Sequence, residues 1–167
     1  GHRIADVDSF GAAVGIYRAA RTMEKKAHIV LDEITTSVRL LYDLFEESSA
    51  YPDDMFIRSS DINEYLTDNA MVVVVDTNKA EITECPELLK RAKTVVVFDH
   101  HRQSGNAIEN TVLSYIEPYA SSACEMVAEV LQYIADDIKI SSLEANSMYA
   151  GIMIDTSNFM NRTGVRT

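Results

Sequence analysis

Two short apolar runs that each stop at an aspartate decide the fold of this chain: VVVVDTN (residues 72–78) and TVVVFDHHR (residues 94–102). Both runs are rich in β-branched residues and too short for helices, so we expect strands over residues 70–76 and 94–99. Continuous apolar strands are typical of a parallel sheet that is covered on both faces. Polar residues directly after such strands lie where open α/β sheets bind their ligands.

The segments around these two strands alternate between extended and helical patterns. Three further strands are expected over residues 27–31, 55–59 and 112–118. Helices are expected over residues 8–26, 35–48, 60–66, 85–92, 121–137 and 141–156. Ser122 and Glu125 have the spacing of a capping box at the start of the fifth helix. This alternation predicts an α/β, doubly wound domain over residues 1–167, with a mainly parallel sheet and helices on both faces.

Composition and charge exclude several functional classes. The chain has 167 residues and a net charge of -11, and we expect this charge to disfavour long nucleic acids, as does the lack of a basic groove with interleaved aromatic residues. No apolar run is long enough to cross a bilayer and the start does not resemble a signal peptide, so we expect a soluble domain. Cys85 and Cys124 do not have CxxC spacing, which favours buried free thiols.

Further acidic and histidine residues gather near both ends of the chain. The opening GHRIADVDS contains the pattern H-x-x-x-D-x-D directly before a helix, and the apolar run GIMID ends at an aspartate. The complete candidate set is His2, Asp6, Asp8, Asp76, Asp99, His100, His101 and Asp155. Clustered carboxylates without cations would repel one another and be forced to protonate. Mixed carboxylate and imidazole ligands suit Mn²⁺, with Co²⁺ or Mg²⁺ as alternatives, and two such ions about 3.5–4 Å apart can clamp a phosphoryl group.

Each candidate also has a simpler interpretation when it is taken alone. His2 follows a glycine, and GH is a common remnant of an affinity tag. Asp8 or Ser9 would serve as the N-cap of the first helix, and Asp76 would cap a turn. Taken together, the spacings favour a shared metal site.

The stretches GHRIADVDSFGAA (residues 1–13), VVVVDTN and FDHHR (residues 98–102) together resemble the DHH phosphoesterase superfamily over essentially the whole chain. Residues 116–131 and 151–167 are similar to the bacterial cyclic-di-AMP phosphodiesterases. Manganese-dependent pyrophosphatases usually carry Asp-His-Asn where this chain has Asp76, Thr77 and Asn78. The resemblance therefore implies a two-metal hydrolase that opens cyclic di-AMP to the linear dinucleotide pApA.

The resemblance also implies a role for each candidate residue. One Mn²⁺ would be held by His2 and Asp6, the other by Asp8, His100 and Asp155, and Asp76 would bridge both. Catalytic roles fall to Asp99, which would fix the tautomer of a histidine, and to His101, which would face the phosphate. Arg102 and Arg162 are candidate substrate contacts, although Arg102 is equally compatible with a solvated surface arginine.

Members of this family are usually longer than this chain. The resemblance implies that the chain is an excised fragment of a membrane-anchored bacterial protein, from a cytoplasmic region that continues into a C-terminal DHH-associated domain. We expect the fragment to bind metal but to hydrolyse a cyclic dinucleotide poorly. The alternatives are another DHH phosphoesterase, acting on oligonucleotides, pAp or pyrophosphate, and a non-catalytic DHH-like sensory module. The sequence leaves a homo-oligomer open.

Overall fold

The computed structural model describes residues 1–103, 105–134 and 138–167. Its strands are β1 (Ile29–Val30), β2 (Phe56–Ile57), β3 (Met71–Val75), β4 (Thr94–Asp99) and β5 (Leu113–Ile116). Its α-helices are α1 (Val7–Thr22), α2 (Arg39–Glu46), α3 (Ile62–Tyr65), α4 (Pro86–Arg91), α5 (Ala123–Ile134) and α6 (Ser142–Asp155). Two short 3-10 helices are η1 (Ser59–Asp61) and η2 (Ala80–Ile82). Each predicted element has a counterpart, but the helix predicted over residues 60–66 is divided between η1 and α3, and the predicted end of the fifth helix at residue 137 lies outside the described residues.

The sheet is parallel, as the apolar runs predict. Strands β3, β4 and β5 pair in parallel, with Val75 opposite Phe98 and Asp99 opposite Ile116. Strands β1 and β2 form a separate parallel pair, so the predicted sheet exists as two pieces. Two residues beyond the end of β1, the backbone N–H of Asp32 donates to the Glu84 carboxylate at 2.5 Å. That backbone donor is therefore used by a side chain and not by a neighbouring strand.

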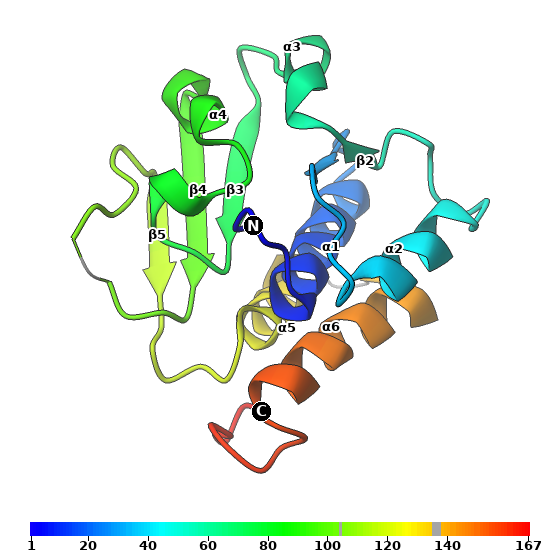
Figure 1. Cartoon of the computed structure of the whole chain (residues 1–167), viewed down its shortest axis with the longest axis vertical. Helices are drawn as coiled ribbons and strands as arrows, with labels where there is room; N and C mark the ends of the chain where they lie inside the picture. The colour runs from blue at the N-terminus through cyan, green and yellow to red at the C-terminus, as the bar shows by residue number, and fades with distance from the viewer. Residues whose placement is uncertain (104, 135–137) are drawn as a thin grey trace.

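Helices cover both faces of the larger sheet (Figure 1). One face packs against α1, α5 and α6 through a cluster that includes Val75, Val96 and Phe98. The opposite face, with Val95 and Val97, packs against partly buried residues of α4. Successive strand side chains point to opposite faces, so a continuous apolar run buries both of them. The predicted doubly wound arrangement is confirmed.

The N-terminus of α1 differs from the prediction. Its N-cap is Asp6, whose carboxylate accepts the backbone N–H of Ser9 at 2.9 Å, while the Ser9 hydroxyl accepts the N–H of Asp6 at 3.2 Å. The expectation that Asp8 or Ser9 caps this helix is therefore wrong, because Asp8 already lies inside α1. At the start of α5, the Ser122 hydroxyl accepts the N–H of Glu125 at 3.0 Å, which is one of the two bonds of the predicted capping box, while Glu125 Oε2 accepts the Ser121 hydroxyl.

Two sequence-based exclusions can be compared with the structure. Cys124 is a buried free thiol, as expected, whereas Cys85 is free but only half-buried. Within the described ranges, no helix combines the length and the apolar character that a membrane span requires.

Candidate metal centre

The candidate residues meet at the carboxyl ends of β3 and β4. Asp76 follows β3 directly, Asp99 is the last residue of β4, and His100 comes next. Because β3 and β4 are parallel and in register, their exits lie at the same edge of the sheet. Asp76 takes a left-handed backbone conformation with φ of 61°, which aspartate tolerates better than most residues. The chain thus turns sharply at Asp76 while its amide still donates to the Phe98 carbonyl at 2.8 Å.

One group of ligand atoms lies beside the N-terminus of α1. His2 Nε2 lies 3.4 Å from Asp6 Oδ2 and 3.4 Å from Asp76 Oδ2. The three ligand atoms of this group all lie within 4.8 Å of one another. His2 is therefore part of a cluster with the two aspartates that its spacing predicts.

A second group lies between the sheet edge and two helices. His100 Nε2 lies 3.3 Å from Asp76 Oδ1, 3.4 Å from Asp155 Oδ2 and 3.8 Å from Asp8 Oδ2. Asp8 comes from the first turn of α1, and Asp155 is the last residue of α6. Residues from the two ends of the chain thus converge on one histidine of the sheet edge.

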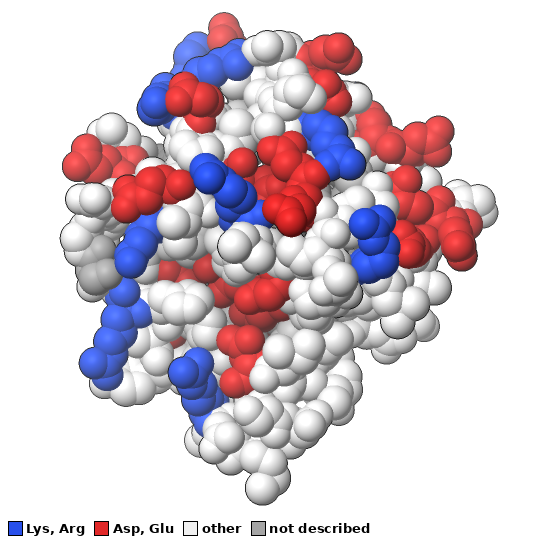
Figure 2. Space-filling view, viewed as in Figure 1, with Lys and Arg blue, Asp and Glu red and all other residues white. Residues whose placement is uncertain are grey.

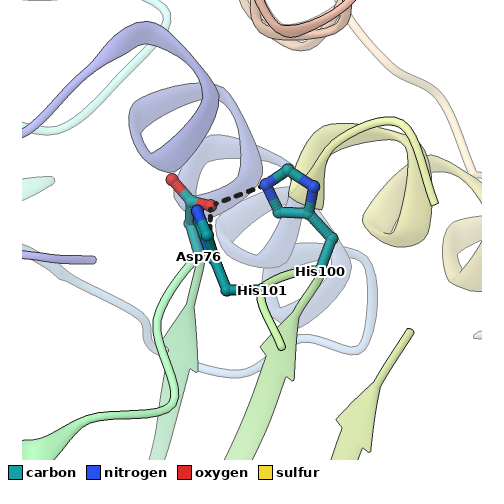
Figure 3. Close-up of side chains that lie close together, drawn as sticks. All are labelled: Asp76, His100 and His101. Atoms are coloured by element: carbon teal, nitrogen blue, oxygen red, sulfur yellow. Dashed lines mark ion pairs between the residues drawn. The ribbon is translucent and has the colours of Figure 1, made fainter. Parts of the chain in front are cut away.

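Asp76 belongs to both groups, with one carboxylate oxygen directed to each. In Figure 3 dashed lines join one oxygen of Asp76 to the rings of both His100 and His101. Asp76 Oδ1 and His100 Nε2 are both buried without a hydrogen-bond partner. Buried polar atoms of this kind require an explanation, and a cation between them supplies one. Ligand atoms bound at about 2.1 Å to one ion lie roughly 3–3.5 Å apart. The spacings of 3.3 and 3.4 Å therefore fit a shared divalent cation, and only Asp8 Oδ2, at 3.8 Å from His100 Nε2, lies slightly farther away.

The charges of the first group stabilise one another. Hydrogen bonds with Asp6 and Asp76 raise the pKa of His2 to about 10, against the opposing effect of burial. Burial would raise the pKa of Asp6, but the hydrogen bond from His2 and the Ser9 amide outweigh it and lower this pKa to about 2. In Asp76 burial would raise the pKa, but the rings of His100 and His2 beside its oxygens outweigh this effect and lower it.

The second group has an excess of buried negative charge. Burial and then the charge of Asp76 raise the pKa of Asp8 to about 7. Burial also raises the pKa of Asp155. For His100, burial opposes protonation, but Asp76 and the charge of Asp8 raise its pKa to about 9. These shifts are those expected of clustered carboxylates that lack a cation.

Asp99 and His101 form a close pair at the same edge, where His101 also makes a third possible ligand group with Asp76 and His100. Asp99 is fully buried, and its Oδ1 lies 2.8 Å from His101 Nδ1 and accepts the His101 backbone N–H at 3.1 Å. The hydrogen bond with Asp99 raises the pKa of His101, whose side chain is 59% exposed. His101 Nδ1 also lies 3.7 Å from Asp76 Oδ1, but its close contact with Asp99 leaves Nε2 as the free ring nitrogen.

Asn78 is a site residue that the sequence reasoning missed. Its side-chain amide donates to Asp99 Oδ2 at 2.6 Å and to the His101 carbonyl at 3.3 Å. Asn78 itself is buried, and its Oδ1 has no hydrogen-bond partner. Its position two residues after Asp76, at a strand exit, was the available signal.

The two candidate arginines lie at the surface. Arg102 and Arg162 are both exposed, and the charge of Arg162 acts to lower the pKa of Asp155. Figure 2 shows the face of the molecule that is turned to the viewer in Figure 1. Acidic side chains lie in the middle of this face, and several basic side chains lie along one side. An anionic ligand would therefore meet repulsion at the centre unless cations are bound there.

Comparison with known proteins identifies relatives, some of which match the whole chain. The family model described as DHH family, N-terminal domain, matches residues 1–152. The chain is 38% identical over 170 residues to the cyclic-di-AMP phosphodiesterase GdpP of Geobacillus thermodenitrificans, covering 100% of this chain and 26% of that protein. A probable manganese-dependent inorganic pyrophosphatase of Thermotoga maritima is 35% identical over 88 residues, which cover 53% of this chain and 15% of that protein.

A solved structure has the same fold. An exopolyphosphatase-related protein from Bacteroides fragilis superposes with a TM-score of 0.74 at 20% sequence identity, covering 99% of this chain and 47% of that one. At this identity the likeness concerns the fold alone. The chain spans about a quarter of the length of the phosphodiesterase that it matches.

Proposed function

Because the chain belongs to the DHH family, we propose that it is the phosphoesterase domain of an enzyme that hydrolyses cyclic di-AMP to pApA, with two divalent metal ions in its site. The observation that carries this proposal is the shared position of Asp76. One of its oxygens faces His2 and Asp6, and the other faces His100. A carboxylate that belongs to one ligand group and also faces the histidine of a second group is the arrangement that a two-ion phosphoesterase needs.

The donor atoms of the site indicate which metal it would bind. His2, Asp6 and Asp76 would hold one ion, and the group of Asp8, His100 and Asp155 would hold the other together with Asp76. Mixed nitrogen and oxygen donors suit Mn²⁺ better than Ca²⁺, and Co²⁺ and Mg²⁺ remain the alternatives. When bound, such ions would neutralise the phosphate and supply Lewis-acid chemistry at phosphorus.

His101 is the residue best suited to contact the phosphate. Its Nδ1 is directed to Asp99, so its exposed Nε2 is the ring nitrogen available to substrate. The raised pKa favours the protonated ring, which would donate a hydrogen bond to a phosphate oxygen. Asp99 and Asn78 would then hold this ring in place, and Arg102 and Arg162 would contact the substrate from the surface.

The choice of cyclic di-AMP is supported by the extent of the similarity. The resemblance to the cyclic-di-AMP phosphodiesterase covers the whole chain, whereas that to the pyrophosphatase covers about half of it. The parent protein would carry a C-terminal DHH-associated domain and a membrane anchor, both outside this chain. The domain formed by this chain would lie in the cytoplasm. We further propose that this chain binds metal but turns over substrate slowly by itself, because the remaining substrate contacts would come from that second domain.

A parallel product assay tests the proposal. Cyclic di-AMP, pApA, a short RNA and pyrophosphate would be offered with Mn²⁺ to this chain and to a longer chain that continues past Thr167. We expect the longer chain to convert cyclic di-AMP to pApA and this chain to do so weakly. Preferential loss of pyrophosphate or pApA would instead support another DHH phosphoesterase. Bound metal with no product from either chain would support a non-catalytic module.

A further inference from the structure

The Asp8 carboxylate links α1 to the N-terminus of α5. Ala123 N–H donates to Asp8 Oδ2 at 2.7 Å, and Cys124 N–H donates to Asp8 Oδ1 at 2.8 Å. The Cys124 thiol donates to the Asp8 carbonyl oxygen at 3.2 Å. The first amides of a helix have no partners within it, so Asp8 satisfies two of them in α5. This side chain, which is 1% exposed, therefore has a defined position before any metal binds.

Helix α6 also packs against Asp8, and it can come this close only because residue 151 is a glycine. A Cβ atom at Gly151 would lie 2.6 Å from Cys124 Sγ, 2.9 Å from Asp8 Cα and 3.0 Å from Asp8 Oδ1. The first two distances are shorter than real Cβ contacts and the third is tighter than most, so an added methyl group must displace a neighbour. The nearby Asp8 atoms cannot yield easily, since one is backbone and the other is a carboxylate oxygen that α5 already holds.

Gly151 also lies one helical turn before the ligand at the end of α6. Residues four apart share one face of a helix, so Gly151 and Asp155 are directed toward the same side. The packing distance between α6 and Asp8 at Gly151 therefore determines the distance between the carboxylates of Asp8 and Asp155. Both lie beside His100 Nε2, at 3.8 and 3.4 Å.

We propose that Gly151 is a positioning residue, whose missing side chain sets the spacing between Asp8 and Asp155 and so the affinity of the second metal position. This inference rests on the proposed function, because it requires that Asp8, His100 and Asp155 hold an ion. The first position, formed by His2, Asp6 and Asp76, is built on the start of α1 and the exit of β3. The two positions therefore differ in their dependence on the junction of α1, α5 and α6.

The substitution Gly151→Ala tests this dependence, and Gly15→Ala is its matched control. A Cβ at Gly15 would lie 2.6 Å from Val127 Cγ1 and 2.8 Å from Met148 Sδ, so it crowds the same three helices. Gly15 lies seven residues, or about two turns, from Asp8 on α1, and its neighbours are not candidate ligands. Both variants are expected to unfold at a lower temperature in EDTA, but only Gly151→Ala should alter metal binding.

The measurement is Mn²⁺ binding to the 167-residue chain, followed by calorimetry and by the electron paramagnetic resonance signal of free Mn²⁺. We expect two ions in the wild type and in Gly15→Ala. In Gly151→Ala one ion should bind as in the wild type and the other about 10–100-fold more weakly, the usual effect of disturbing the support of a ligand.

A double variant, Gly151→Ala with Cys124→Ala, keeps the test valid if the single variant does not fold. It removes the 2.6 Å overlap with the thiol but keeps the crowding of Asp8, so it should show the same weakened position. Cys124→Ala alone retains the backbone donor and should bind two ions normally. Two ions with wild-type affinity in both the Gly151→Ala variant and the double variant would overturn this inference alone, as would an equal loss in Gly15→Ala. Fewer than two ions in the wild type would overturn the proposed function together with it.

Discussion

A buried ion pair between α1 and α6 gives the sharpest prediction about stability. Glu144 is fully buried at the start of α6, and Arg18 approaches it with Nη2 at 2.6 Å and with Nε at 2.9 Å from both oxygens. The Glu144 carboxylate also accepts the backbone N–H of Ser141 at 2.8 Å, which completes the capping box of α6. Glu144→Gln keeps the volume and one acceptor oxygen but removes the charge.

The size of the effect follows from the burial of the two partners. Removing one partner of a buried ion pair costs about 3–5 kcal/mol because the other charge is left unpaired. Arg18 keeps 25% of its side chain exposed and can turn toward water, and the glutamine oxygen can still accept one hydrogen bond. We therefore expect the free energy of unfolding to fall by about 2–3 kcal/mol. For a chain of this size this corresponds to a decrease of roughly 5–10 °C in Tm.

The assay is urea and thermal unfolding followed by circular dichroism in EDTA, so that metal does not contribute. Glu87→Gln is the matched control, because Lys90 Nζ and Glu87 Oε1 are also 2.6 Å apart but lie in an exposed pair. That control should leave the urea midpoint nearly unchanged, since exposed pairs contribute little. An equal loss of unfolding free energy in Glu144→Gln and Glu87→Gln would refute the reasoning. The two ion pairs have the same distance, so a difference between the variants must come from burial. Arg18→Gln, which leaves the buried carboxylate unpaired, should cost more than Glu144→Gln, and the double variant less than the sum of the two.

Three further predictions concern the site. Asp76→Asn should abolish tight binding of both Mn²⁺ ions in a calorimetric titration, whereas Asp6→Asn should weaken only one. In the metal-free chain the pKa values of His2 and His100 are about 10 and 9, so both rings are protonated at pH 7.5 and metal must displace about two protons. Calorimetry in buffers of different ionisation enthalpy should detect this release, and the affinity for each ion should fall roughly 10-fold per pH unit below the pKa of its histidine, because each ion displaces one histidine proton. Asn78→Ala should lower turnover by the longer chain about 10–100-fold without changing metal stoichiometry, whereas an equal loss of bound metal would contradict the role given to Asn78.

The strand exits could be predicted from the sequence because their signal is local. A run such as residues 72–75 can bury both faces only inside a covered sheet, and the polar residue after it must then lie at the sheet edge. The pattern H-x-x-x-D-x-D likewise keeps its three side chains within a few residues of one helix start. These local patterns were sufficient to collect the eight candidate residues.

The parts that could not be predicted depend on contacts between distant segments. The sequence favoured Asp8 or Ser9 as the cap of α1, but the cap is Asp6, and the Asp8 carboxylate accepts amides of α5 that lie 115 and 116 residues away. Asn78 reaches Asp99 only because two parallel strands bring their exits together. The division of the sheet into two pieces, and the bond from Asp32 beyond β1 to the Glu84 carboxylate, are likewise not marked by any local pattern.

The ligand carboxylates also differ in which groups stabilise their charge without metal. Asp6 and Asp8 accept backbone amides of α1 and α5, so the N-termini of two helices stabilise two of the carboxylates. Asp76 has no comparable support at Oδ1, which is buried without a partner beside the equally unpartnered His100 Nε2. The aspartates at helix starts thus contribute to the fold whether or not metal is present. The aspartate at the strand exit has the rings of His100 and His2 beside its two oxygens, at 3.3 and 3.4 Å, and bound cations would take the place of their protons at the residue that both groups share.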